Sequence, residues 1–340
     1  MSIMGMREWF RKNRVLMLVV FILLLAGLLI SYGHFGGNTT YTAADYEKMV
    51  ADAREAYAAN SSDPATVQAL ASILADYAAF LNDDKADQET VKAVDDEALK
   101  YYNEYYGLMV LDATESYQAE QNYANAYMVA SYLQQRAQVQ SMMDGMDGKA
   151  ISDQANQWMV TAMTHRIDEL NADLAENSTD HTIIADLADA TAALAYYQHE
   201  LDAEVDIDAA YLEAIDLCEQ AIENCGNDVE PAVKASYYQK AANYAENTGN
   251  NVLAEEYYRM SLETAPADYD ANVALAAFLL GDNRYDETIE LLTAYRETLS
   301  DDDANAANID SSIEYVEALK EAAENPDTDT EDDNNSGDAN

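Results

Sequence analysis

Five acidic residues follow the spacing of a calcium-binding loop. They occupy positions 1, 3, 5, 7 and 12 of the twelve-residue template: Asp202, Glu204, Asp206, Asp208 and Glu213. The template needs glycine at its sixth position for a sharp turn, and Ile207 stands there. A helical pattern also begins inside the segment. We therefore expect an acidic connector between helices without a bound metal, and these five residues are the candidate ligands if a metal does bind.

The other reactive residue types form no catalytic pattern. The four histidines lack zinc spacing, and the sequence contains neither a glycine-rich phosphate loop nor a Gly-x-Ser-x-Gly nucleophile motif. Cys218 and Cys225 are seven residues apart on one predicted helix, about 10 Å along its axis, too far for a disulfide. We therefore expect no enzymatic activity, no cofactor and no disulfide.

An apolar run from Val15 to Tyr32 predicts a membrane-spanning helix. At about 1.5 Å per residue the run is about 27 Å long, close to the thickness of a hydrocarbon core. Four basic residues precede it, which places residues 1–14 in the cytoplasm and the remainder outside. The alternative is a cleaved signal peptide, but the run is too long and no small-x-small site follows. The anchor residues are Val15, Leu18, Phe21, Leu24, Leu28 and Ile30.

The charge balance changes at the end of this apolar run. Four of the 18 basic residues but only one of the 64 acidic residues precede Val15. Such an acidic outer part repels nucleic acid and favours cations or basic partners. An acidic surface is also a simple adaptation to a cation-rich exterior. Equal use of Lys and Arg with many Asn and Tyr residues is more typical of a bacterium than of an extreme halophile.

The composition of the outer part predicts an all-α fold. Only 12 glycines and 4 prolines occur in 340 residues, and strand patterns are absent. Helix breakers divide the chain into about eleven helices, with two long middle helices at about 112–143 and 149–176. The breakers are Asn60 to Pro64, Asn82 to Asp84, Asp144 to Gly148, Asn177 to Asp180, Gly226 to Pro231, Gly249, Pro266 and Gly281 to Asn283.

A repeat with a period near 34 residues runs through the C-terminal half. Ala254 and Thr288 stand at equivalent positions 34 residues apart, and Ala214 precedes Ala254 by one period plus a six-residue insertion. Small residues where two helices cross let the helix axes approach closely. Around Asp63-Pro64 the pattern recurs in part. The expected packing residues are Leu70, Leu74, Tyr77, Ala214, Cys218, Ala221, Tyr238, Ala242, Ala254, Tyr258, Pro266, Ala276, Thr288 and Leu292.

This pattern resembles the tetratricopeptide repeat (TPR) family, best over residues 205–300. The resemblance implies an α-solenoid of stacked antiparallel helix pairs, which we expect over residues 43–324, after a linker at 33–42 and before a disordered acidic tail at 325–340. It also implies binding of a protein or peptide. Family members that hold acidic peptides use a basic clamp, from which this chain departs because Lys234 and Lys240 lie among carboxylates.

These observations predict a membrane-tethered, extracytoplasmic scaffold that binds a basic or partly apolar polypeptide. By topology it is similar to the repeat-containing ancillary subunit of bacterial secretion translocons. With 25 tyrosines, some of which must be exposed, the surface suits an apolar and basic contact, although inter-repeat packing also accounts for tyrosines. The alternative is an acidic envelope protein that binds cations or a cationic polymer. We expect no nucleic acid partner.

Overall fold

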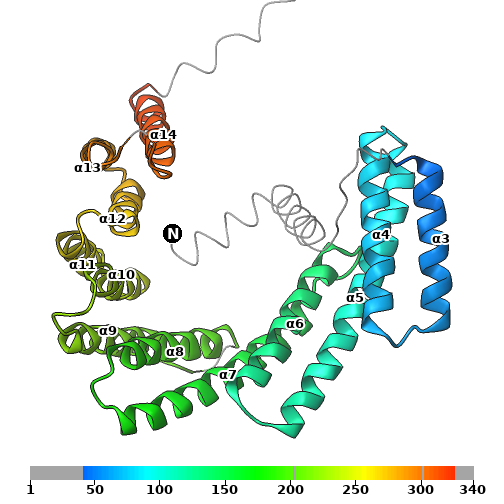
Figure 1. The fold of residues 1–340 in the computed structure, drawn as a ribbon, viewed down its shortest axis with the longest axis horizontal. Helices are drawn as coiled ribbons and strands as arrows, with labels where there is room; N and C mark the ends of the chain where they lie inside the picture. Colours follow the sequence, from blue (N-terminus) through cyan, green and yellow to red (C-terminus); the bar gives the residue numbers. More distant parts are fainter. Residues whose placement is uncertain (1–40, 202–203, 301, 326–340) are drawn as a thin grey trace, which may run out of the picture. The chain divides into compact units, whose positions relative to one another are not determined.

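The computed structural model describes residues 41–201, 204–300 and 302–325 (Figure 1). This part of the chain is entirely helical apart from its connections. The predicted anchor, Val15 to Tyr32, lies outside the described residues. The helices are α3 (Ala43–Ala59), α4 (Pro64–Asp83), α5 (Gln88–Ala119), α6 (Tyr123–Met142), α7 (Lys149–Glu176), α8 (His181–Glu200), α9 (Ile207–Asn224), α10 (Pro231–Asn247), α11 (Asn251–Thr264), α12 (Tyr269–Gly281), α13 (Tyr285–Arg296) and α14 (Ala306–Glu324).

The helices begin where short polar side chains cap their first turns. Asp63 accepts a hydrogen bond from the backbone N–H of Ala65 at 3.2 Å, and Asp87 accepts one from Thr90 at 2.9 Å. Asp268 caps α12 in the same way through Ala271 at 2.9 Å. These side chains satisfy donors that the helix itself leaves unpaired. Some of the many aspartates in this chain therefore act as caps at the first turns of helices.

One predicted boundary is wrong. The sequence predicted a single helix over about 112–143, whereas α5 ends at Ala119 and α6 begins at Tyr123. The side chain of Asn122 accepts from the backbone N–H of Asn125 at 2.9 Å, and the Asn125 side chain donates back to the Glu120 carbonyl at 2.9 Å. These two hydrogen bonds of Asn125, one to Asn122 and one to Glu120, mark the end of one helix and the start of the next without glycine or proline. Twelve helices result in the described part of the chain, where about eleven were predicted.

The described residues fall into two compact units. The N-terminal unit comprises residues 41–178 and 189–210, and the C-terminal unit comprises residues 179–188 and 211–325. In the N-terminal unit α3 packs against α4, α4 against α5, α5 against α6 and α6 against α7. Val50, Leu70, Leu74 and Ala98 join α3, α4 and α5 in one apolar core. A second core joins α5, α6 and α7.

The C-terminal unit is the more regular one. Helices α10 to α14 pack in sequence, and α10 also contacts α12, the first helix of the following pair. Ala276, Leu292, Tyr295 and Ile309 form a core shared by α12, α13 and α14. No pair in this arrangement buries its apolar face alone, which is the physical rule of helical repeats. The described part of the chain is thus all-α, and within each unit consecutive helices stack on one another.

One described helix, α4, is long and apolar enough to cross a membrane by length and composition. Its residues Leu70, Ala71 and Leu74 are fully or almost fully buried within the helical stack. The apolar character of α4 is explained by this burial between α3 and α5.

Candidate binding groove

The predicted packing residues lie largely in the interior. Those that are buried share small or apolar side chains on the helices of the two units: Leu70, Leu74, Ala214, Cys218, Ala221, Ala242, Ala254, Tyr258, Ala276, Thr288 and Leu292. Tyr77 and Tyr238 are half-buried, and Pro266 is exposed. The equivalent positions Ala254 and Thr288 are 0% and 1% exposed, so the 34-residue spacing corresponds to equivalent sites in the C-terminal unit.

Many tyrosines connect helices through their hydroxyl groups. In the C-terminal unit Tyr257 donates to Glu219 at 2.5 Å and Tyr258 donates to Glu246 at 2.7 Å. Burial, followed by the hydrogen bond to the carboxylate, raises the pKa of both phenols. In the N-terminal unit Tyr57 donates to Glu104 at 2.8 Å. These tyrosines pack between helices, and their hydroxyl groups are hydrogen-bonded to the carboxylates named here.

The segment with calcium-loop spacing is divided by the start of a helix. Asp202 lies outside the described residues, and α9 begins at Ile207 in the middle of the template. The Asp206 carboxylate accepts from the backbone N–H of Ala209 at 3.0 Å and so caps α9. Over the described ranges, no three His, Cys, Asp or Glu side chains are grouped to hold a metal ion. A loop interrupted by a helix start cannot wrap around a cation as the template does.

Neither cysteine forms a disulfide in the structure. Cys218 is buried, and Cys225 is half-buried. Burial raises the pKa of the Cys225 thiol, an effect that Lys234 partly opposes.

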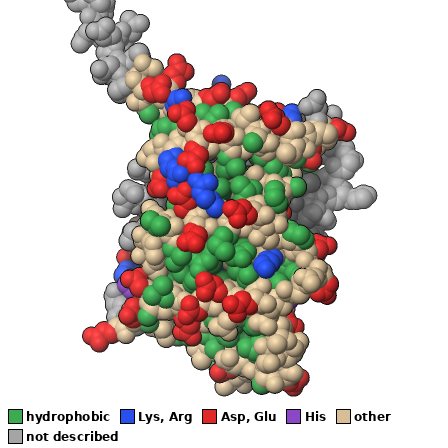
Figure 2. Space-filling model, turned by 90° about the vertical axis from the view of Figure 1, so that its left-hand side faces the viewer, with side chains coloured by type: hydrophobic (Ala, Val, Ile, Leu, Met, Phe, Trp, Pro, Cys, Tyr) green, Lys and Arg blue, Asp and Glu red, His purple; other side chains and the backbone are tan. Residues whose placement is uncertain are grey.

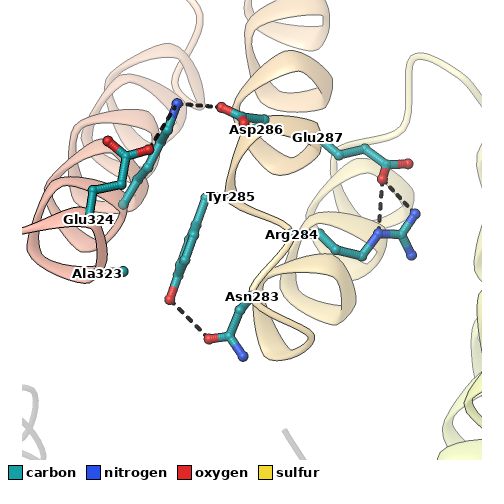
Figure 3. Close-up of a pocket in the computed structure, with 8 residues that line it drawn as sticks. Asn283, Arg284, Tyr285, Asp286, Glu287, Ala323 and Glu324 are labelled. Atoms are coloured by element: carbon teal, nitrogen blue, oxygen red, sulfur yellow. Dashed lines mark hydrogen bonds and ion pairs between the residues drawn. The ribbon is translucent and has the colours of Figure 1, made fainter.

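A pocket of about 420 Å³ lies between the start of α13 and the end of α14 (Figure 3). Its charged groups are already paired with one another, since Lys320 binds Asp286 at 2.5 Å and Arg284 binds Glu287 at 2.5 Å. The Tyr285 hydroxyl donates to Asn283 at 2.9 Å. A ligand here would have to displace these contacts, so the pocket is better described as a bridged crevice between two helices.

Arginines and glutamates close a ring beside this crevice. Arg259 binds Glu255 at 2.7 Å and Glu287 at 2.6 Å, and Arg284 binds the same two carboxylates at 2.7 and 2.5 Å. On the face drawn in Figure 2, basic side chains likewise lie next to acidic ones, with apolar side chains between such groups. The ring links α11 to α13, so we assign it to the stability of the C-terminal unit.

A second pocket, of about 520 Å³, lies in the N-terminal unit where α4 starts beside α5. We call it the α5 groove. It is lined by Ser62, Asp63, Pro64, Ala65, Leu108, Met109, Asp112 and Glu115. Four of the lining residues are apolar, three are acidic and none is basic. Asp63 is engaged in capping α4, whereas Asp112 and Glu115 project from exposed positions of α5.

The groove exists because two neighbouring helices differ in length. α4 has 20 residues and α5 has 32, and the two are antiparallel neighbours joined by a short connection. The difference leaves about three turns, or roughly 18 Å, of α5 beyond the first turn of α4. Burial changes accordingly along α5. Every residue from Tyr101 to Val110 is buried or half-buried, and Leu111 and Asp112 are exposed.

The exposed end of α5 holds an unusual apolar side chain and two unpaired carboxylates. Leu111 is 63% exposed, and it lies on the edge of the helical stripe formed by Leu108, Asp112 and Glu115. No basic side chain in the described part of the chain forms an ion pair with Asp112 or Glu115. Of the two pockets, only this one offers charges that a partner could neutralise.

The sequence reasoning did not identify the α5 groove. Its predicted long helix over about 112–143 joined α5 to α6 and therefore hid the true end of α5 at Ala119. Asp87 and Asn122, which cap α5 and α6, are the signals that give the correct length of α5. The Leu108-Met109 pair followed by Asp112 and Glu115 was also visible as a mixed apolar and acidic stripe.

Comparison with known proteins gives structural similarity alone. No protein-family model matches the chain, and no curated protein sequence matches it. The crystal structure of yeast Tom70 is similar over 84% of this chain, with 12% identity and a TM-score of 0.34, and the chain spans 61% of that protein. Acl4 (residues 1–338), an assembly chaperone of RpL4, is similar over 83% of this chain and 94% of its own, with 17% identity and a TM-score of 0.31. At these values neither structure carries a function over to this chain.

Proposed function

We propose that this protein is a binding scaffold whose α5 groove receives a basic, partly apolar polypeptide segment. The observation that carries the proposal is that the apolar residues Leu108 and Met109 line the groove together with the carboxylates Asp112 and Glu115, with no basic lining residue. Burial of apolar area supplies affinity at roughly 25 cal/mol per Å². The carboxylates add charge selectivity and a faster encounter rather than large affinity. The proposal assigns the protein no chemical step and no cofactor.

The proposed scaffold is held at a membrane by residues 15–32, with residues 33–340 outside the cytoplasm. The support for this part is the apolar run and the basic residues before it. Tethering raises the effective concentration of the groove for partners at the same membrane. Extraction at alkaline pH should leave the full chain in the membrane fraction. Protease added to intact cells should cleave residues 43–324, and full protection of this region would refute the orientation.

The binding proposal is tested with the full chain in detergent micelles and fluorescent peptides of about 14 residues. One peptide is built from Lys, Leu and Ala, and its counterpart has Glu in place of Lys. We expect the basic peptide to bind at least tenfold more tightly by fluorescence anisotropy, with the difference decreasing as salt screens the charges. Equal binding of the two peptides would contradict the proposal.

Charge reversal locates the binding to the groove. The double variant Asp112→Lys/Glu115→Lys changes two exposed residues three positions apart. It should lower the affinity for the basic peptide about tenfold. The matched control is Asp52→Lys/Glu55→Lys, which makes the same charge change at two exposed positions with the same spacing on α3. The control variant should bind within about twofold of the original protein. An equal loss in both variants would show a response to net charge alone.

A further inference from the structure

The face of α5 that forms the groove is the continuation of the face that packs on α4. Ala98 lies in the core with Leu70 and Leu74 of α4, and one turn later Tyr102 packs against Ala71. The Tyr102 hydroxyl also lies 3.2 Å from the Ser72 hydroxyl. Tyr101 packs against the same core as Ala98. Alternating steps of four and three residues from Tyr101 lead along one stripe to Leu108 and then to Asp112 and Glu115. The stripe thus passes from a helix-covered part to an open part of α5.

The open part of this stripe has the dimensions of a helix-packing site. Neighbouring helix axes lie 8–10 Å apart in such pairs, and their side chains interdigitate along the i, i+3 and i, i+4 rows. The uncovered length is about three turns, or roughly 18 Å, which about twelve residues of helix would span. Pro64 begins α4 at the near end of this space, so α4 cannot itself extend into it.

The side chains of the stripe specify the chemistry of the missing helix. Leu108, Met109 and the 63% exposed Leu111 call for an apolar stripe on the partner. Asp112 and Glu115, three residues apart on one face, call for Lys or Arg beside that stripe. A second copy of this chain is a poor electrostatic match for the acidic groove, because the chain itself has 64 acidic residues and only 18 basic ones.

We infer that the α5 groove binds a short basic amphipathic α-helix of a partner protein, which packs along α5 in line with α4. This inference rests on the proposed function and adds the conformation of the bound segment. The helix would have Leu-type residues at i, i+3 and i+4 spacing, with Lys or Arg flanking them. It would be about three turns long, so it need not be helical before binding.

The inference is tested with two basic peptides of equal composition and charge, measured with the full chain in detergent micelles. In the first, the Leu residues follow i, i+3 and i+4 spacing; in the second, the order is changed so that Leu and Lys alternate with a period of two. We expect the helical-period peptide to bind at least tenfold more tightly. The helical-period peptide with one central Ala→Pro substitution should bind at least tenfold more weakly, because proline breaks a helix interior.

The outcomes separate this inference from the proposed function. Equal binding of the three basic peptides, with the loss in Asp112→Lys/Glu115→Lys retained, would overturn the helix and leave the groove as a site for extended segments. Failure of all basic peptides to bind would overturn both. Self-association of the chain that disappears in Asp112→Lys/Glu115→Lys would identify a second copy as the occupant and overturn the inference. Helical binding that is unchanged in the groove variant would place the helix elsewhere and overturn it as well.

Discussion

The two units use the same helix-pair packing with different consequences for their surfaces. In the C-terminal unit, helices α10 to α13 have 17, 14, 13 and 12 residues, so each of these differs from the next by at most three residues, and only the last helix, α14 with 19, is much longer than its neighbour. In the N-terminal unit, α4, α5, α6 and α7 have 20, 32, 20 and 28 residues. A helix that outruns its neighbour leaves part of a packing face without a partner. Unequal helix length is therefore enough to turn a repeat core into a binding surface.

The crevice at α13 and the α5 groove also differ in how their charges are used. Near α13 the C-terminal unit pairs Arg259 and Arg284 with Glu255 and Glu287, and Lys320 with Asp286. On the α5 stripe of the N-terminal unit, Asp112 and Glu115 face solvent without such partners. Complete pairing stabilises contacts inside a unit, whereas unpaired carboxylates beside apolar groups are available to another molecule.

The largest loss of stability should follow from a substitution in the apolar core of the C-terminal unit. Leu275 is 1% exposed, so Leu275→Ala removes buried methyl groups and leaves a cavity. We expect a loss of about 2–5 kcal/mol in the free energy of unfolding. Hydrogen exchange, read segment by segment, should show faster exchange in α10 to α14. Equally faster exchange in α3 to α7 would show that the two units unfold together and would break the comparison.

A smaller loss should follow from removing one tyrosine hydroxyl between helices. Tyr258 is 4% exposed; its hydroxyl donates to Glu246 at 2.7 Å and lies 3.0 Å from the Asn243 side-chain oxygen. Tyr258→Phe removes this hydroxyl and should lower the free energy of unfolding, measured in urea, by about 1–2 kcal/mol. The control is Tyr315→Phe, which removes a hydroxyl from a residue that is 60% exposed and should change stability by less than about 0.5 kcal/mol.

The same tyrosines predict how stability depends on alkaline pH. Burial raises the pKa of Tyr237 to about 12, and burial with a carboxylate acceptor raises the pKa of Tyr258 as well. Because the neutral phenol is favoured in the folded state, this contribution is fully present below the unfolded value of about 10. It is lost as pH rises through the folded values. Absorbance at about 295 nm should show these phenols ionising together with unfolding, and the alkaline loss should be smaller in Tyr258→Phe.

Local sequence signals predicted the fold well because they report on single helices. Gly249, Pro266 and Asn283 all stand at or near helix ends in the structure. The 34-residue spacing of Ala254 and Thr288 reports on packing that repeats along the chain, and both residues are buried. The helix break before Tyr123 was not predicted because it is formed by asparagines, which are common in this chain, and not by glycine or proline.

The groove could not be predicted in the same way, because it depends on a relation between two helices. Leu108 and Glu115 are ordinary helical residues when α5 is considered alone. They line an open groove only because α4 begins at Pro64, opposite the middle of α5. Recognising this requires correct bounds for both helices and their antiparallel pairing. Helix boundaries are the least certain part of a sequence-based assignment, so an error of a few residues removes the groove.

The ionic ring should make a smaller contribution that depends on salt. Arg284 is 33% exposed in its side chain, so Arg284→Met should lower stability by less than about 1 kcal/mol at low salt. The difference should decrease at 1 M salt, where charges are screened within about 3 Å. Hydrogen bonds from the arginines lower the pKa of Glu255 and Glu287. This contribution is therefore present above their ordinary values and is lost as pH falls through the lowered ones. A salt-independent loss would assign the role of Arg284 to packing of its aliphatic stem.

Substitution of Leu111 should have the smallest effect on stability and a clear effect on peptide binding. Its side chain is 63% exposed, so Leu111→Ala removes little buried surface and should change the free energy of unfolding by less than about 0.5 kcal/mol. The same change removes an apolar contact that a docked partner would cover, and the basic peptide should bind about three- to tenfold more weakly. Leu212→Ala is the matched control in the C-terminal unit, since Leu212 is 51% exposed. Because Leu212 does not line the α5 groove, peptide binding by Leu212→Ala should be unchanged. Equal peptide affinity in the original protein and in Leu111→Ala would mean that the open end of α5 is simply exposed helix, and the distinction between the two units would then be one of length alone.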